Sequence, residues 1–387
     1  VISVSFCAGN YTIGPAAGND YPSIAVALDT LYGAGIAGPV IFNVQSGVYT
    51  GQLTIGNIEG TTETNTITFQ SATRNASDVK LTATAITTTD NYVVNLDGIR
   101  NLYLRHLSIY ANGPAATSNA VRLANAENIH FSDVNIKVKG TTNNANSSCM
   151  VINPGPRLLY LDGCTLDSGY YSVRSMVADT GLASGMFFTE NNFINFWSQG
   201  IYLRKVNDIL IRHNLVSSGV SIASRALTGI TVAEVTGGID IERNNIVLYD
   251  NKTGGKRPLV ISNCVGTNTD RGKIYNNMCV AYGTAAGSPT SQGITINGSM
   301  YMNVYFNSVR LYAGLTAPAT RSFSVDSASS AIYVVNNIFT NFSKGYAYWL
   351  NSLANVATSN YNVFYSDTAS ATKKLARIAT AELNTLD

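Results

Sequence analysis

The sequence is poor in charged residues. Asp, Glu, Lys and Arg make up 12% of its 387 residues, and its formal net charge is +2. Lys and Arg form no run longer than a pair, so the sequence gives little support to electrostatic capture of nucleic acid or of an anionic membrane. No apolar run approaches the roughly 20 residues that a membrane-spanning helix needs. The chain begins without Met, and we expect a mature product or a fragment of a longer protein.

Histidine is scarce, with three residues in all, and the five cysteines show no Cys-x-x-Cys spacing. No histidine lies near a cysteine at the spacing of zinc ligands, which argues against a zinc site. Cys149 and Cys164 are 15 residues apart, as are Cys264 and Cys279. We expect buried free thiols, because lone cysteines are commonly core residues. Two disulfides in an exported protein are the alternative.

The most prominent feature of the sequence is an internal repeat. A hexad with the pattern apolar-x-apolar-x-x-Asn recurs at spacings of 30, 33, 30 and 30 residues from Asn214 to Asn337. The same frame extends upstream to the hexads that end at Leu107, Val134 and Cys164, and downstream to Asn362. The asparagines expected to form a structural ladder are Asn192, Asn214, Asn244, Asn277, Asn307 and Asn337.

Each hexad predicts a short strand that ends in a bend. Apolar and polar residues alternate within it, and a further apolar residue follows two positions after its end. Asn tolerates the left-handed conformation that a bend requires, and stacked Asn amides can bond from coil to coil. His106 and His213 both stand at the bend position of their hexads. We therefore expect a structural role in the bend for both, in preference to a catalytic role. Coils of 22 to 33 residues predict an all-β fold, a right-handed parallel β-helix of about ten or more coils with an N-terminal capping helix.

The ends of the chain differ from the repeat. An N-terminal cap is expected over residues 1–38, with a helix at 21–32 whose apolar face covers the first coil. Coils are expected over 39–366. The segment 367–387 has helical character and is expected to cap the other end. No linker-like change of composition interrupts the coils, so we predict a single domain over 1–387.

The N-terminal stretch "GNYTIGPAAGNDYPSIAVALDTLYGAGIAGPVIFNVQSGVYTGQLTI" resembles the opening of β-helix domains in large secreted and cell-surface proteins of Bacteroidetes-type bacteria, many of them exported by the type IX secretion system. The ending "NYNVFYSD…IATAELNTLD" is similar to the closing segment of that group. The chain also resembles the pectate-lyase-like superfamily, and "SGVYTGQLTI" is similar to the first coil of pectin methylesterases. The resemblance implies a secreted or cell-surface location and a parallel β-helix.

Outward-facing positions of neighbouring hexads should form columns about 4.8 Å apart. The fourth positions would bring Asp162, Glu190, Arg212 and Glu242 together on one face. Asp162 beside Glu190 could have a raised carboxyl pKa, bind calcium, or act as an acid–base pair on a sugar chain. Calcium is the one cofactor that this pair suggests; otherwise no cofactor is expected. The alternative, which we prefer, is a cross-strand ladder of ion pairs.

The second and fourth positions also align aromatic side chains. Rings exposed in a row could stack on successive sugars of a polysaccharide. The alternative is that these rings favour strands for local reasons and are covered by a loop. The predicted carbohydrate-binding residues are Tyr103, His130, Tyr160, Phe188, Tyr275 and Tyr305.

Known chemistries of the fold find little support. "NTD" at 268–270 matches the first catalytic motif of the polygalacturonase-like hydrolases, but no histidine follows His213, and their Gly-His-Gly motif is missing. A lyase would need a cation or Arg to neutralise a uronate and a Lys or Arg base to remove a proton. The residues that would serve, with Glu190 and Glu242, are Arg204, Lys205 and Arg212.

We therefore expect an extracellular, non-catalytic domain of a larger surface protein that serves in adhesion or carbohydrate binding. A lyase or glycoside hydrolase that acts on an acidic polysaccharide is the alternative, and a structural spacer is the second alternative. The expected partners are a polysaccharide or cell-surface glycan and other domains of a longer chain, and not nucleic acid.

Overall fold

The computed structural model describes residues 6–84, 87, 90–113, 118–176, 183–219, 225–250, 254–283, 290–312, 317–367 and 373–384. The chain divides into two compact units, Val1–Asn192 and Phe193–Asp387, which are treated in turn. Their described strands form a β-solenoid of about 11 turns, which confirms the predicted fold class. In the described part of the chain, no helix has the length and apolar character that crossing a membrane requires.

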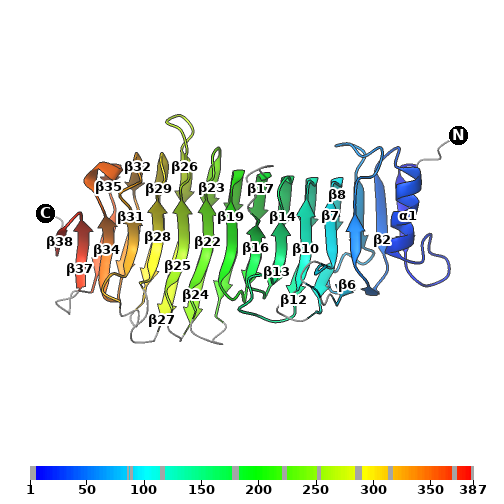
Figure 1. Cartoon of the computed structure of the whole chain (residues 1–387), viewed down its shortest axis with the longest axis horizontal. Coiled ribbons are helices and arrows are strands. Elements are labelled where there is room, and N and C mark those ends of the chain that lie inside the picture. The colour runs from blue at the N-terminus through cyan, green and yellow to red at the C-terminus, as the bar shows by residue number, and fades with distance from the viewer. Residues whose placement is uncertain are drawn as a thin grey trace. The chain divides into compact units, whose positions relative to one another are not determined.

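The first unit contains three parallel sheets, called 1a, 2a and 3a here, and the helix α1 (Ile24–Ala34). Figure 1 shows α1 beside β2 at the N-terminal end of this unit. Sheet 1a consists of β1 (Gly9–Ile13), β2 (Val40–Val44), β5 (Ile67–Ser71), β8 (Arg100–Arg105), β11 (Glu127–Ser132), β14 (Arg157–Asp162) and β17 (Ala183–Thr189). Sheet 2a consists of β3 (Gly47–Thr50), β6 (Val79–Ala83), β9 (Ser108–Ala111), β12 (Asn135–Val138) and β15 (Thr165–Asp167). Sheet 3a consists of β4 (Leu53–Ile55), β7 (Val94–Asp97), β10 (Asn119–Ala124), β13 (Ser148–Ile152) and β16 (Tyr171–Ser175).

The second unit repeats the arrangement in sheets 1b, 2b and 3b, and the strand β18 (Asn192–Ile194) contains the boundary. Sheet 1b consists of β20 (Val206–Arg212), β23 (Ile239–Glu242), β26 (Gly272–Tyr275), β29 (Met302–Tyr305), β32 (Ile332–Val335) and β35 (Val356–Asn360). Sheet 2b consists of β21 (Leu215–Ser218), β24 (Asn245–Asp250), β27 (Met278–Gly283), β30 (Ser308–Leu311), β33 (Ile338–Asn341) and β36 (Val363–Ser366). Sheet 3b consists of β19 (Gln199–Arg204), β22 (Leu227–Ala233), β25 (Lys256–Ser262), β28 (Gln292–Asn297), β31 (Arg321–Val325), β34 (Gly345–Leu350), β37 (Lys373–Ile378) and β38 (Ala381–Leu383). A short 3-10 helix, η2 (Leu353–Asn355), precedes β35.

The core lies inside the coils and follows the hexad pattern. In sheet 1b, the third residue of each hexad points inward and is fully buried, from Ile211 through Ile241, Ile274 and Val304 to Val334. The fifth residue adopts the left-handed conformation, with φ of 56° at His213 and 51° at His106. The predicted bend role of both histidines is therefore confirmed.

An asparagine ladder runs along the second unit, as predicted. Nδ2 of Asn277 donates to Oδ1 of Asn307 at 3.0 Å, and Oδ1 of Asn277 accepts from Nδ2 of Asn244 at 2.9 Å. The same Oδ1 also accepts from the backbone N–H of Asn244 at 3.1 Å. Equivalent side-chain bonds join Asn214 to Asn244, Asn307 to Asn337 and Asn337 to Asn362. The amides from Asn214 to Asn337 are buried, so the hydrogen-bonding groups of neighbouring coils are paired by these side chains and not by water.

The hexad frame is off by one residue at β17. Phe187, not Phe188, pairs with Tyr160, and Phe188 is fully buried. Asn191 holds the position predicted for Asn192, since its Oδ1 accepts from the backbone N–H of Cys164 at 2.9 Å. "FFTENN" contains two aromatic residues and two asparagines in succession, so its pattern fits two registers equally well. The fit of Phe188 into the core decides between them.

The two terminal segments had different outcomes. The predicted N-terminal helix exists over Ile24–Ala34 and buries Ile24, Ala27, Leu28 and Leu31. That this helix caps the first coil stays a prediction. That residues 1–387 form a single domain also stays a prediction. The predicted helical character of the C-terminal segment is wrong, because β37 pairs in parallel with β34 and then in antiparallel with β38. All five cysteines are free, and the four within the coils are buried.

Candidate functional site

The predicted aromatic row of the first unit forms a continuous stack. Neighbouring ring centres lie 4.2 Å apart from Tyr103 to His130, 4.2 Å from His130 to Tyr160 and 4.8 Å from Tyr160 to Phe187. The planes are within 17° of parallel. His130 and Tyr160 therefore have neighbours on both faces. A sugar could reach only the edges of these two rings, so the predicted face-on stacking is closed to it.

His130 is held neutral inside this stack. Its pKa is lowered to about 4, first by burial and then by the positive charge of Arg105. One ring nitrogen, Nε2, lies 2.8 Å from Oδ1 of Asn128, whose Nδ2 donates to Oδ1 of Asn101 at 2.7 Å. These contacts fix the ring in place, and they give His130 a structural role in the sheet.

The predicted acidic column does not form in the first unit. Thr189 is the residue beside Asp162, and Glu190 stands at the bend with φ of 58°. The predicted neighbour relation of Asp162 and Glu190 is therefore wrong, and the calcium site loses its geometric basis. Over the described ranges, no group of three or more His, Cys, Asp or Glu side chains is placed to hold a metal ion.

Arg204 and Lys205 are engaged elsewhere. Arg204 ends β19 of sheet 3b and pairs with Glu234, with Nη2 2.6 Å from Oε1. Nζ of Lys205 lies 4.0 Å from Oε2 of the same carboxylate. This ion-pair cluster occupies the side chains that a lyase would have used together with Arg212.

The candidate site of the second unit is built on β23, where Asp240 and Glu242 share the exterior face. The pairing of sheet 1b sets Arg212 beside Glu242 and Lys273 beside Asp240. Tyr275 lies beside Glu242 on the next strand. Two carboxylates, two cations and a phenol are thus brought together by three neighbouring strands.

The electrostatics of this group raise the pKa of Asp240. Burial is the main cause, followed by the charge of Glu242, while Lys273, a hydrogen bond with Tyr275 and Arg212 act in the opposite direction. The pKa of Tyr275 is also raised, by burial, by a hydrogen bond with Glu242 and by the negative charges nearby. Within the described residues, the buried Oδ1 of Asp240 has no hydrogen-bond partner. A carboxyl group in such surroundings can hold a proton at a higher pH than usual.

An aromatic surface continues from this acidic pair along sheet 1b. Tyr275 and Tyr305 stack at 5.0 Å, and Phe306 meets Tyr305 edge to face at 5.7 Å. Phe306 is 54% exposed because it stands at a bend, and Tyr333 is 40% exposed. The guanidinium carbon of Arg271 lies 4.0 Å from the centre of the Tyr333 ring. A shallow hollow of about 250 Å³ is lined by Asn303, Val304, Tyr305, Phe306, Tyr333, Val335 and Asn336.

We call the exposed part of this face the sheet-1b surface. It comprises Asp240, Lys273, Tyr275, Asn303, Tyr305, Phe306 and Tyr333, and the adjoining Glu242 is 6% exposed. It offers ring faces, amide and hydroxyl groups, and charges of both signs along consecutive coils. That combination suits a polyhydroxylated chain, since sugars present both C–H faces and hydroxyls.

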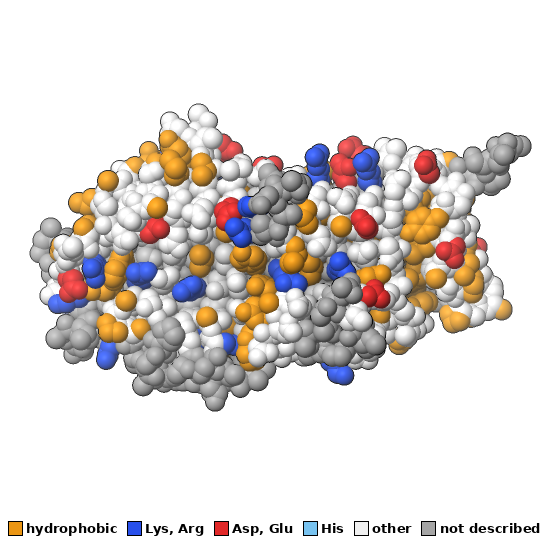
Figure 2. Space-filling model, viewed as in Figure 1, with side chains coloured by type: hydrophobic (Ala, Val, Ile, Leu, Met, Phe, Trp, Pro, Cys, Tyr) orange, Lys and Arg blue, Asp and Glu red, His pale blue; other side chains and the backbone are white. Residues whose placement is uncertain are grey.

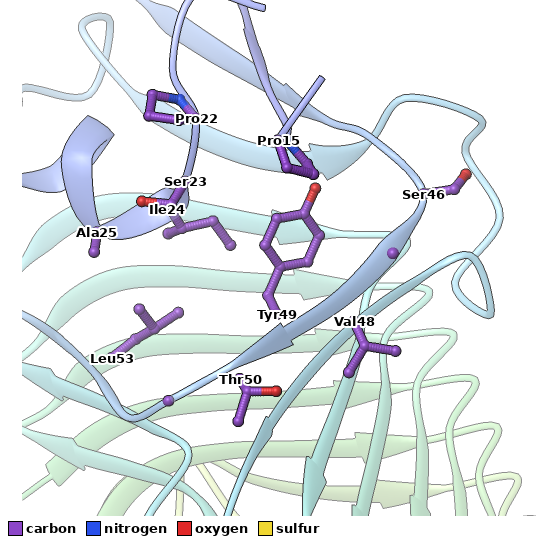
Figure 3. A pocket seen from close by; sticks show the side chains of 12 residues that line it. Pro15, Pro22, Ser23, Ile24, Ala25, Ser46, Val48, Tyr49, Thr50 and Leu53 are labelled. Carbon is purple, nitrogen blue, oxygen red and sulfur yellow. The ribbon is translucent and has the colours of Figure 1, made fainter. Parts of the chain in front are cut away.

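Two other hollows offer less chemistry. A pocket of about 340 Å³ lies between the start of α1 and β3, and Figure 3 shows the Tyr49 ring projecting into it toward Pro15. Its lining is free of charged side chains, and the Tyr49 hydroxyl donates to the carbonyl of Gln45 at 2.8 Å. A groove of about 480 Å³ on sheet 2b is mostly apolar, and Arg310 is the one charged residue in its lining.

Sequence reasoning identified Glu242, Tyr275, Tyr305 and Arg212 but missed three residues of this region. Asp240 was missed although "IDIE" alternates two carboxylates with two apolar residues, which is a recognisable mark of an acidic strand face. Phe306 stands at a bend position, where the pattern predicts only a turn residue. Tyr333 is the second residue of its hexad, which is an outward-facing position, but it was not selected as a binding residue although it is 40% exposed.

No protein-family model matches this chain, and no curated protein matches its sequence. Among solved structures, the lacto-N-biosidase of family GH136 from Eubacterium ramulus is similar over 96% of this chain and 68% of its own, with a TM-score of 0.50 and 9% identity. The Streptococcus pneumoniae surface protein and adhesin PfbA is similar over 88% of this chain and 95% of its own, with a TM-score of 0.50 and 12% identity. A pectin methylesterase from Aspergillus niger aligns over 98% of this chain and 93% of its own, with a TM-score of 0.37 and 12% identity.

The structural neighbours are right-handed parallel β-helix proteins, which supports the right-handed parallel β-helix predicted from the sequence. At identities this low, the similarity establishes the fold and leaves the activity open. The closer resemblance to Bacteroidetes-type secreted proteins stays a prediction.

Proposed function

We propose that this chain is an extracellular carbohydrate-binding domain that holds a polysaccharide along the sheet-1b surface without cleaving it. The carrying observation is the exposure of Phe306 and Tyr333 beside the hollow of about 250 Å³. Aromatic rings immobilised by a sheet bind with little loss of side-chain entropy, and sugars stack on such rings. Asn303 and the phenol of Tyr305 supply hydrogen-bonding groups between the two rings.

The extracellular part of the proposal is supported by the resemblance of the N-terminal stretch to secreted β-helix domains. It is compatible with the fold of the pneumococcal surface protein, although that fold alone does not assign a location. The domain would serve in adhesion as part of a larger surface protein. A purely structural spacer would have the same fold but no affinity for glycans.

A glycan array with the purified chain tests the proposal. We expect binding to at least one polysaccharide class, and loss of that binding in Phe306→Ser and Tyr333→Ala. Tyr249→Ala is the matched control, since Tyr249 is 45% exposed but lies on sheet 2b. Binding that survives both substitutions, or that Tyr249→Ala weakens equally, would contradict the proposal. An array without any binding would favour the spacer.

A catalytic function is the second candidate, and the raised pKa of Asp240 beside Glu242 favours it. A protonated Asp240 would serve as general acid for a hydrolase, with Glu242 as its partner carboxylate. A lyase would use Arg212 or Lys273 to neutralise a uronate. Acidic polysaccharides incubated with the chain would then yield new reducing ends, and in the lyase case also the ultraviolet absorbance of a new double bond. Activity abolished by Asp240→Asn or Arg212→Ala would replace the binding proposal, whereas unchanged substrates would exclude this candidate for the polysaccharides tried.

A further inference from the structure

The exterior of sheet 3b carries a second surface that is distinct from sheet 1b. Figure 1 shows its strands side by side, from β22 in green to β37 in red. Two neighbouring columns of side chains cross these strands. The first column is Gln292, Arg321, Tyr346 and Lys374, which Arg257 extends when the register of Leu259 with Ile294 is continued two residues toward the start of both strands, and the second is Val260, Thr295, Ser324, Trp349 and Arg377.

These columns contain four cations and no acidic residue. In the first column, a cation alternates with a neutral hydrogen-bonding residue: Arg257, Arg321 and Lys374 are separated by Gln292 and Tyr346. Figure 2 shows basic side chains spread over the part of this face that β25 to β37 form. The nearest acidic neighbour by pairing is Glu382 on β38, opposite Arg377. Its Oε1 accepts from the Tyr346 hydroxyl at 2.5 Å.

The positive charge is not compensated within the cluster. Burial lowers the pKa of Arg321, and the positive charges of Arg257 and Arg377 lower it further. In the described part of the chain, none of the four cations is in an ion pair within 4.0 Å. Each cation therefore makes the charged form of its neighbours less favourable. An anion bound among the four cations would relieve this electrostatic repulsion.

The guanidinium groups are held in fixed positions. Trp349 lies between two of them, with the guanidinium carbon of Arg321 4.6 Å and that of Arg377 4.4 Å from the ring. In the amide orientation that satisfies both of its ends, Gln292 accepts from Nε of Arg321 at 3.1 Å and donates to Oγ1 of Thr295 at 3.1 Å. Nη2 of Arg321 donates to the same oxygen of Gln292, and Nε of Arg377 donates to the carbonyl of Ala379 at 3.2 Å, so an oxyanion would meet the remaining N–H groups of the two guanidiniums.

The spacing of the cations selects among polyanions. Cations in the first column recur every second strand, which corresponds to about 10 Å. This distance is the length of about two sugar rings in an extended chain, whereas duplex DNA carries one charge per about 1.7 Å. Trp349, with a guanidinium near its ring on two sides, offers no open platform for a nucleic-acid base. The pattern fits a chain whose charges are sparse and regular.

We infer that sheet 3b binds an acidic polysaccharide, laid across the strands, whose carboxylate or sulfate groups pair with Arg257, Arg321, Lys374 and Arg377. The neutral residues between the cations, Gln292, Thr295, Ser324 and Tyr346, are at most 9% exposed, so they hold the cations in position and do not contact the sugars. This site is separate from the sheet-1b surface and does not depend on the function proposed there.

Calorimetric titration of the full chain with four probes of similar length tests this inference. The probes are a κ-carrageenan octasaccharide with one sulfate per two sugars, a hyaluronan octasaccharide with one carboxylate per two sugars, a neutral cello-oligosaccharide and a single-stranded DNA. We expect saturable binding of the sulfated probe, the carboxylated probe or both at about 0.15 M salt, weakening as salt rises. Whichever probe binds identifies the anionic group. No binding of either acidic saccharide, or equally tight binding of the DNA, would overturn the inference.

Substitutions then locate the site. The double variant Arg257→Gln/Lys374→Gln changes outer side chains of the first column, and Arg321→Gln changes the central one. Each should weaken acidic-saccharide binding by about tenfold or more, because charge-assisted hydrogen bonds are lost. Arg310→Gln removes the same charge from sheet 2b and should leave binding unchanged. An equal loss in Arg310→Gln, or no loss in the double variant, would show that the inferred site is wrong.

Discussion

Removing one amide from the asparagine ladder should destabilise the chain far more than a typical surface substitution. Asn277→Ala removes four hydrogen bonds from a residue that is 1% exposed. Two of them are accepted by Oδ1 of Asn277, from the backbone N–H and from Nδ2 of Asn244. The other two are donated by Nδ2 of Asn277, to the carbonyl of Ile241 at 2.8 Å and to Oδ1 of Asn307 at 3.0 Å.

The size of the effect follows from what is left unpaired. The side chains of Asn244 and Asn307 each keep another partner, the carbonyl of Ile211 and the backbone N–H of Asn277. The backbone N–H of Asn244 loses its partner, and a buried unsatisfied group costs about 1–3 kcal/mol. With a net loss of about 1 kcal/mol for the other bonds together, we expect the free energy of unfolding to fall by about 2–4 kcal/mol.

Chemical denaturation followed by circular dichroism measures this change as a shift of the midpoint at constant slope. Asn192→Ala is the control, because Asn192 lies next to the ladder residue Asn191 but outside the ladder, and we expect a change within about 0.5 kcal/mol. Asn277→Asp keeps the shape but replaces the donor by a second acceptor facing Ile241 and Asn307, so it should destabilise at least as much at pH 7. If Asn277→Ala and Asn192→Ala had equal effects, the ladder would not support the coils as described.

Three further predictions concern other parts of the chain. Phe188→Ala should lower the free energy of unfolding by about 3–5 kcal/mol because it empties a core site, and Phe187→Ala should cost clearly less in the same denaturation assay; equal losses would restore the sequence-based register. In the native chain only Cys7 should react with a thiol reagent, because burial raises the pKa of Cys164 to about 12 and of Cys264 to about 11; fast native labelling of any coil cysteine would refute this. His130 should titrate near pH 4 by NMR, identified by loss of its signal in His130→Gln. Because the folded state binds its proton less readily than the unfolded state, this residue should lower stability as the pH falls from about 6.5 toward 4; a His130 midpoint near 6.5 would contradict the stacked geometry.

The sequence predicted the register of a coil correctly wherever an asparagine at the end of the hexad identified that coil unambiguously. Asn244, Asn277 and Asn307 each close a hexad whose alternating residues fit the frame in one register, although Asn245 and Asn276 stand beside two of them, so their positions and the bends before them followed directly. At β17 the doubled residues of "FFTENN" left two registers, and the difference of one residue moved Phe188 from the exterior to the core. The C-terminal segment has local helical preference, but the open edge of β34 offers hydrogen bonds that only a strand can complete.

The candidate sites were harder to predict from the sequence than the fold was. In β25, Pro258 and Leu259 are buried in succession, which interrupts the strict alternation by which exterior residues can be recognised. Arg257 and Arg321 are 64 residues apart in the sequence and become members of one column only through the register of three strands. Asp240 and Tyr275, by contrast, occupy the second and fourth positions of consecutive hexads, and the pairing of β23 with β26 agrees with that frame. The columns of sheet 3b depend on the lengths of the loops between strands, which no local pattern fixes.

The most direct test of the account is a pair of engineered disulfides in sheet 1b, with Cys7 replaced by serine. Lys273 and Asn303 are opposite each other on β26 and β29, so their Cα atoms lie about 4.8 Å apart, within the range of a disulfide. Lys273→Cys/Asn303→Cys should therefore cross-link on mild oxidation and close a loop that mass spectrometry detects after proteolysis. Lys273→Cys/Tyr305→Cys, displaced by two residues to about 8 Å, should not. Cross-linking of the second pair in preference to the first would contradict the register of sheet 1b, on which the proposed sheet-1b surface depends.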